Sequence, residues 1–126
     1  PVSAPFHSSL MQPAADAMKD ALADTIIYEP SVPVLANVTV APLTEPDHIR
    51  QSLVDQVTGQ VRWRESIEWF APNGVDQLLE IGSGKVLTGL ARRIDRSLVG
   101  MPVNTPQDVQ AMAAKLTGAP APERLP

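Results

Sequence analysis

Short apolar runs alternate with amphipathic helical segments along this chain, and this alternation limits its possible folds more than any other feature. Runs rich in valine, leucine and isoleucine predict strands at residues 32–40, 75–81 and 98–101. Apolar residues at helical spacing predict helices at residues 8–24, 44–58, 62–71, 85–94 and 106–116. Strands that alternate with helices indicate an α/β layer structure with a mainly parallel sheet.

The predicted sheet is small for a layered fold. A chain of 126 residues is long enough for one domain with a modest core. Three strands are few for a sheet that helices cover on both faces, so we expect further strands to come from another segment. Residues 118–126 are rich in proline and alanine, and we expect them to form a disordered tail.

The composition argues against several classes of protein. The chain has no cysteine, so it can form no disulfide, thiolate metal site or thiol nucleophile, and this fits a reducing, cytoplasmic setting. The net charge is −4 and no large basic cluster occurs, so we expect no nucleic-acid partner. No apolar run reaches the length that spans a membrane. No set of His, Asp and Glu residues has convincing metal-ligand spacing, so we expect no metal site.

His7 is the first candidate for chemistry. It lies in a proline-bounded segment just before the first predicted helix, and such joints often present functional groups. A histidine can accept a proton from a weak nucleophile near neutral pH and return it later. The chain has no cysteine, and none of its serines lies in a nucleophile-elbow pattern. The sequence therefore predicts part of an enzyme that holds the base without the nucleophile, and the alternative is a surface or structural histidine.

The second candidate is the glycine-rich turn formed by Gly82, Ser83 and Gly84. It joins a predicted strand to a predicted helix, whose first N–H groups are able to bind an anion or line a pocket. The dinucleotide-binding, phosphate-loop and serine-elbow patterns all fail here; for example, Leu79 and Val86 occupy positions that the phosphate loop requires to be glycine and Ser or Thr. The alternative interpretation is an ordinary strand-to-helix turn.

A few other polar residues are weaker candidates. Asn37 interrupts an apolar run, and a buried amide must find hydrogen-bond partners, so a structural role is the simpler interpretation. Gln56, near the end of a predicted helix, is by itself an ordinary solvated residue. Lys85, Arg92 and Arg93 make part of the fourth predicted helix basic, which suits either a solvated face or an acidic partner.

Four blocks of sequence together resemble the malonyl-CoA:acyl-carrier-protein transacylases of bacterial fatty-acid synthesis. In chain order they are Pro-Val-Ser-Ala-Pro-Phe-His-Ser-Ser-Leu-Met, Val-Pro-Val-Leu-Ala-Asn-Val, Gln-Val-Thr-Gly-Gln-Val-Arg-Trp-Arg-Glu-Ser-Ile and Leu-Leu-Glu-Ile-Gly-Ser-Gly-Lys-Val-Leu-Thr-Gly-Leu. Four blocks in the right order are far more specific than any one of them. The resemblance covers residues 1–117 and only the C-terminal part of the family's length.

This resemblance implies a fold and a division into parts. The family has a large α/β-hydrolase-like subdomain with a smaller ferredoxin-like subdomain inserted into it. Residues 1–7 are expected to end the small subdomain and return to the large one, and residues 8–117 to form the C-terminal part of the large subdomain. Residues 118–126 remain the expected tail. Ser83 stands where the family usually has proline, which we expect to loosen that turn without abolishing function.

The resemblance also implies an enzyme, an [acyl-carrier-protein] S-malonyltransferase. A serine takes malonyl from malonyl-CoA and passes it to the phosphopantetheine thiol of acyl carrier protein by a ping-pong mechanism that needs no cofactor. His7 matches the family's general acid and base, and Gln56 matches a position whose backbone carbonyl orients that histidine. Asn37 and the turn of Gly82, Ser83 and Gly84 match positions near the site. The serine, its oxyanion-hole donor and the malonate-binding arginine belong to an N-terminal segment that is absent here, so we expect this fragment to be inactive alone.

A non-catalytic role is the alternative. In it the chain is an acyltransferase-like module that docks the acidic acyl carrier protein through Lys85, Arg92 and Arg93. Under either interpretation the expected partners are acyl carrier protein, malonyl-CoA and the segment that carries the serine. We expect neither nucleic acid nor a membrane among them.

Overall fold

A computed structural model describes residues 5–118 of the chain. The chain divides into two compact units, residues 1–69 and residues 70–126. Residues 1–4 and 119–126, which include most of the predicted tail, lie outside the described residues. Among residues 5–118, no helix has the length and apolarity needed to span a bilayer.

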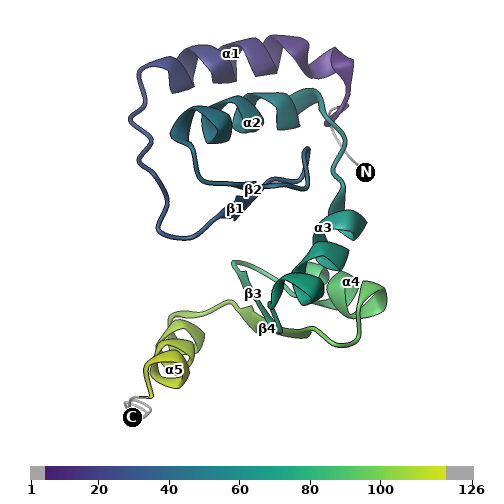
Figure 1. The fold of residues 1–126 in the computed structure, drawn as a ribbon, viewed down its shortest axis with the longest axis vertical. Coiled ribbons are helices and arrows are strands. Elements are labelled where there is room, and N and C mark those ends of the chain that lie inside the picture. Colours follow the sequence, from purple (N-terminus) through teal and green to yellow (C-terminus); the bar gives the residue numbers. More distant parts are fainter. Residues whose placement is uncertain (1–4, 119–126) are drawn as a thin grey trace. The chain divides into compact units, whose positions relative to one another are not determined.

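Two helices pack side by side in the first unit (Figure 1). A short 3₁₀ turn, Ser9–Met11, leads into α1, Gln12–Ala23, and α2 is Pro46–Thr58. Each helix has a proline in its first turn, where no intrahelical N–H donor is required. Ala15 and Ser52 are buried on these helices, and such small side chains allow two helices to approach closely.

The predicted strand at residues 32–40 is wrong in the structure. Within this run only β1, Val34–Leu35, is a strand, and it pairs antiparallel with β2, Pro42–Leu43, which precedes the helix predicted at 44–58. Between them the chain turns back from Ala36 to Val40, where the N–H of Val40 donates to the carbonyl of Ala36 at 2.9 Å. Val40 has a φ of 54°, a rare conformation for a β-branched residue. The apolar run therefore supplies one strand and the turn of a hairpin, because the turn is closed by a backbone hydrogen bond that periodicity does not reveal.

A third helix follows in the first unit. It is α3, Trp63–Phe70, close to the predicted 62–71, and the boundary between the two units falls at its last residue. Ile67 on this helix is fully buried. A 3₁₀ turn, Ala71–Asn73, ends at Gly74, whose φ of 82° lies in the left-handed region that glycine adopts without steric cost.

The second unit contains a parallel strand pair with a crossover helix. The strands are β3, Gln77–Ile81, and β4, Val99–Val103, with Leu79 opposite Met101. Helix α4, Val86–Ile94, packs on both strands (Figure 1). The strands and the helix thus form the α/β unit with a small parallel sheet that the sequence predicted for this region.

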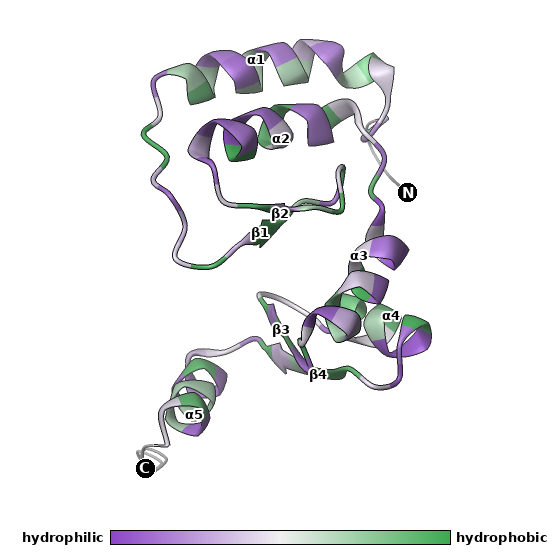
Figure 2. Ribbon diagram, in the orientation of Figure 1, coloured by the Kyte–Doolittle hydropathy of each residue, from purple (hydrophilic) through white to green (hydrophobic). Residues whose placement is uncertain are grey.

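The core of the second unit is small. Ala91, Leu98 and Val103 are buried, whereas Ile81, an apolar residue of the strand predicted at 75–81, is 76% exposed. Helix α4 carries both apolar and hydrophilic residues (Figure 2), and its Val86 is also exposed. Helix α5, Pro106–Thr117, contacts β4. Its start carries a capping box, in which the side chains and backbone N–H groups of Thr105 and Asp108 bond reciprocally.

Candidate active site

His7 lies on a tight turn just before the first helical residues. Its φ of 60° is in the left-handed region, which costs energy for a residue with a side chain. The hydroxyl of Ser8 donates to the carbonyl of Pro5 at 2.8 Å, and the N–H of Met11 donates to the carbonyl of Ser8 at 3.0 Å. These bonds hold the turn on both sides of the histidine. The imidazole is exposed, so it is accessible to a partner group.

The ring of His7 contacts the C-terminal end of α2. Its Nδ1 lies 2.8 Å from the carbonyl oxygen of Gln56. This carbonyl is among the last four of the helix, so no N–H of the helix itself is available to it. A carbonyl only accepts hydrogen bonds, so Nδ1 must be the protonated nitrogen. In the neutral ring Nε2 is then unprotonated and able to accept a proton.

The end of α2 lies against the turn between β1 and β2. A Cβ at Gly59, the residue after the helix, would lie 2.7 Å from Cγ2 of Val38 and 2.8 Å from the carbonyl oxygen of Asp55. The N–H of Arg62 donates to the carbonyl of Asn37 at 3.0 Å. Asn37 is therefore half-buried in a turn, not inside a strand as predicted, and its main chain contacts the segment that follows α2.

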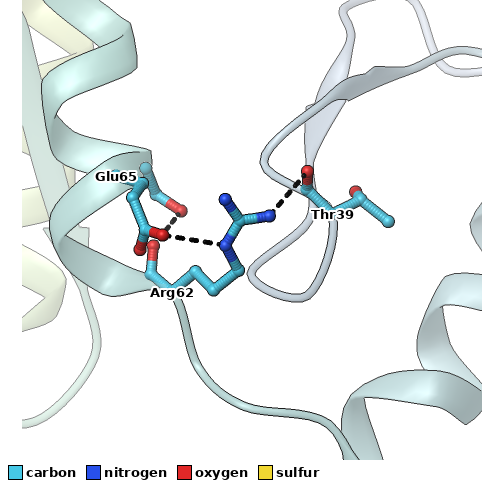
Figure 3. Close-up of polar contacts among 4 residues, drawn as sticks. Thr39, Arg62 and Glu65 are labelled. Carbon is cyan, nitrogen blue, oxygen red and sulfur yellow. Dashed lines mark hydrogen bonds and ion pairs between the residues drawn. The ribbon is translucent and has the colours of Figure 1, made fainter.

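Arg62 is a residue that the sequence analysis did not single out. Its Nη1 donates to the carbonyl of Thr39 at 3.4 Å, and its Nε donates to the Glu65 carboxylate at 2.9 Å (Figure 3). This hydrogen bond from Arg62 is the main cause that lowers the pKa of Glu65. The only sequence signal was the Arg and Glu spacing of three residues at a helix start, which also describes many surface pairs.

The glycine-rich turn lies in the second unit, between β3 and α4. Gly82 and Gly84 have φ values of 139° and 100°, which residues with a Cβ rarely adopt. The Glu80 carboxylate accepts the N–H of Leu87 at 3.0 Å, the N–H of Thr88 at 2.7 Å and the hydroxyl of Thr88 at 2.6 Å. Two N–H groups that an external anion would need are thus already bonded within the chain.

Glu80 was also missed by the sequence analysis. The hydroxyl of Thr88, then its N–H group, lower the pKa of this carboxyl group, so it carries a negative charge at the positive end of the α4 dipole. A glutamate at the end of a strand, followed by a glycine turn and a helix, was the signal that could have found it. Its role in the structure is to hold the turn and the helix start together.

The remaining predicted residues also lie in the second unit. Ser83 and Lys85 are exposed in the turn before α4, and Arg92 and Arg93 are exposed in the last turn of that helix. Positive charges in the last turn of a helix are favourable by themselves, which is a sufficient structural reason for the two arginines. In the described part of the chain, no group of three or more His, Asp or Glu side chains is arranged to hold a metal ion.

Comparisons with known proteins give a consistent result, although no family model matches the chain. It is 47% identical over 116 residues to the malonyl CoA-acyl carrier protein transacylase of Escherichia coli strain K12, an alignment that covers 92% of this chain and 37% of the relative. A crystal structure of the acyl-carrier-protein S-malonyltransferase from Bartonella henselae has 55% sequence identity and a TM-score of 0.85, with 94% of this chain and 38% of that chain covered.

A third comparison is with a complex. In it a malonyl transacylase is bound to a type II polyketide acyl carrier protein, and the match has 40% sequence identity, a TM-score of 0.81, and covers 93% of this chain and 37% of that one. The chain therefore spans a little more than a third of the length of the relatives it matches. The matched region is their C-terminal part.

Proposed function

We propose that this chain supplies the histidine of a malonyl transfer site. The chain belongs to the malonyl-CoA:acyl-carrier-protein transacylase family and spans about 37% of the length of the relatives it matches. The observation that carries the proposal is the hydrogen bond from Nδ1 of His7 to the Gln56 carbonyl. It fixes one tautomer and leaves Nε2 as the base. An exposed ring in this state is suited to receive a proton from a nucleophile on another segment.

The proposed mechanism is a two-step acyl transfer. The nucleophile is a serine in the part of the family's length that this chain does not span. Nε2 of His7 accepts the hydroxyl proton as the serine oxygen forms a bond to the malonyl thioester carbon. The bond from that carbon to the sulfur of coenzyme A breaks, and the departing thiolate takes the proton from Nε2. The thiol of a carrier protein's phosphopantetheine group then reverses these events and removes malonyl from the serine.

Gln56 has a distinct part in this mechanism. While His7 holds the extra proton, its ring is positively charged and both nitrogens are donors. The Gln56 carbonyl accepts the Nδ1–H in this state as it does in the neutral ring, so the imidazole keeps its orientation throughout the transfer. A main-chain oxygen here replaces the carboxylate that completes a Ser-His-Asp triad. The identity of the side chain at position 56 is then unimportant.

We further propose that residues 8–117 form the C-terminal part of an α/β-hydrolase-like subdomain, and residues 1–7 the end of an inserted one. Two observations support this. The pair of β3 and β4 with the crossover helix α4 is the repeating unit of such sheets. Apolar residues on this unit, such as Val99 and Ile81, are exposed, and neighbouring strands or helices would bury them.

The proposal is tested by His7→Ala in a protein that contains this chain together with the serine segment. We expect the rate of malonyl transfer from malonyl-CoA to acyl carrier protein, followed as release of free coenzyme A thiol, to fall by at least about 100-fold. Gln56→Ala, which keeps the main-chain carbonyl, is the matched control and should retain most of the activity. A correctly folded His7→Ala protein with unchanged activity would refute the assignment.

A docking role is the second candidate. It is favoured by the exposure of Arg92 and Arg93 and by the relative solved together with a carrier protein. The two roles separate in the same experiment, because a chain that only docks acyl carrier protein through these arginines would not need the imidazole of His7. Unchanged transfer in His7→Ala, with transfer lost in the Arg92 and Arg93 alanine variants, would favour docking.

A further inference from the structure

Arg62 connects three parts of the first unit. It follows α2, and its main-chain N–H and its guanidinium reach two carbonyls of the turn between β1 and β2, those of Asn37 and Thr39. Its Nε donates to Glu65 in the first turn of α3 (Figure 3). Its own carbonyl accepts the N–H and the hydroxyl of Ser66, at 3.0 Å and 2.9 Å. One residue thus ties the end of α2 and the start of α3 to the turn.

The turn that Arg62 holds is in a strained conformation. The φ of 54° at Val40 is unfavourable for a β-branched residue, so the turn persists only because its surroundings fix it. The same turn presents Val38 to Gly59, at the end of α2, with no space for even a methyl group at residue 59. A shift of the turn would therefore be transmitted to the last residues of α2.

His7 depends on the last residues of α2. Its Nδ1 hydrogen bond to the Gln56 carbonyl has a length of 2.8 Å, and such bonds weaken when the atoms separate by about half an ångström. Gln56 is in the last turn of α2, three residues before Gly59 and six before Arg62. We propose that Arg62 is a positioning residue for His7: it fixes the turn against the end of α2 and so keeps the Gln56 carbonyl in reach of Nδ1.

If Arg62 only stabilised the fold, we would expect a different result from its removal. The side chains of Arg62 and Glu65 are 42% and 46% exposed, and ion pairs this exposed contribute little to stability. If Arg62 only added such a pair, its removal would leave the imidazole of His7 unaffected. The state of that imidazole therefore distinguishes positioning from general stabilisation.

The test is nitrogen-15 NMR of the imidazole rings in the full chain at a pH at which they are neutral. The two histidines are His7 and His48, and the exposed His48 serves as an internal reference. In the unmodified chain we expect His7 mainly as the Nδ1–H tautomer. In Arg62→Ala we expect the ratio of the Nδ1–H to the Nε2–H form to fall at least twofold. Arg64→Ala is the matched control, because Arg64 pairs with Glu68 on the exposed face of α3, and should leave the ratio unchanged.

A second variant covers the case in which Arg62→Ala does not fold. Arg62→Lys keeps the charge and the main-chain N–H but is unable to donate to Thr39 and Glu65 with the geometry of a guanidinium. We expect its tautomer ratio to lie between those of the unmodified chain and Arg62→Ala. An unchanged ratio in the folded variants would overturn the positioning role.

The inference rests on the proposed function, and the two fail in different ways. An unmodified chain in which His7 lacks the Nδ1–H tautomer would contradict the base proposed above, whatever Arg62 does. An unmodified chain with that tautomer, unaltered in both Arg62 variants, would contradict only the positioning role.

Discussion

Gly59→Ala tests how closely the end of α2 fits the turn beside it. Gly59 has a φ of −82° and a ψ of 156°, so alanine is able to adopt its backbone conformation without strain. The new Cβ would nevertheless lie 2.7 Å from Cγ2 of Val38 and 2.8 Å from the carbonyl oxygen of Asp55. Cβ contacts under 3.0 Å essentially never occur in proteins, so one of these neighbours must move.

The expected change in the free energy of unfolding combines one stabilising term and two destabilising terms. Replacing glycine with alanine at a compatible backbone position stabilises a protein by about 0.4–1 kcal/mol through the unfolded chain. Overpacking by a methyl group costs about 1–3 kcal/mol. The Asp55 carbonyl already accepts the N–H of Gly59 at 2.8 Å, so moving it weakens a hydrogen bond worth about 1 kcal/mol. We expect Gly59→Ala to lower the free energy of unfolding by about 1–2 kcal/mol.

Urea unfolding measures this change directly. The two tryptophans, Trp63 and Trp69, both lie in the first unit, so their fluorescence reports on the unit that contains Gly59. Gly89→Ala in α4 is the matched control, followed by far-UV circular dichroism, because its Cβ would meet nothing within 4 Å in the described residues other than its chain neighbours and its own helix backbone. This control should stabilise the second unit by about 0.5–1 kcal/mol. A Gly59→Ala chain as stable as the unmodified one would refute the close fit.

Two further changes test the strained turn at Val40 and the carboxylate of Glu80. Val40→Gly removes a positive-φ strain of about 1–2 kcal/mol, which offsets the loss of a half-buried side chain, so we expect the urea midpoint to change little. A large loss of stability would show that the turn is not strained. Glu80→Gln removes a carboxyl group whose pKa is lowered from 4.5 in the folded chain, mainly by the hydroxyl of Thr88. The stability that this carboxyl group adds is present above its pKa in the unfolded chain and is lost as pH falls through its pKa in the folded chain. The urea midpoints of the two proteins should therefore differ near neutral pH and converge well below pH 4.5. A difference in midpoint that does not depend on pH would contradict this.

Helix starts and ends were the easiest features to predict, because local residues determine them. Pro46 and Pro106 occupy first helical positions, where the missing N–H is not needed. Thr105 and Asp108 form the capping box at the start of α5 from side chains only three residues apart. These signals need no knowledge of the rest of the fold, so the helix bounds agree with the sequence to within a few residues.

The hairpin at β1 and β2 was missed because its cause is not local. The apolar run 32–40 fits a buried strand, but Val34 and Leu35 pair with Leu43 and Pro42, beyond a turn that a backbone hydrogen bond from Val40 to Ala36 closes. The exposure of Ile81 was missed for a similar reason. A residue pattern predicts that a side chain is suited to burial, whereas its actual burial depends on which segments pack against it.

The candidate site was predictable only where the residue type itself indicates a chemical role. His7 was found from its residue type and its place before a helix. The role of the Gln56 carbonyl was predicted from the family resemblance alone, because every residue has a main-chain carbonyl and the sequence does not distinguish this one. Arg62 and Glu80 were missed because each acts on the main chain of distant residues, namely Thr39 for Arg62, and Leu87 and Thr88 for Glu80.

The main-chain acceptor of His7 has a consequence for how such a chain evolves. A carboxylate that orients a histidine is lost through a single codon change, whereas a carbonyl oxygen survives every substitution at position 56. Selection for the orientation of His7 would then act on the residues that set the path of the backbone. Gly59, which has no room for a methyl group, and Arg62, whose guanidinium donates to the Thr39 carbonyl, are such positions. A genetic comparison restricted to contacting side chains would overlook both of them.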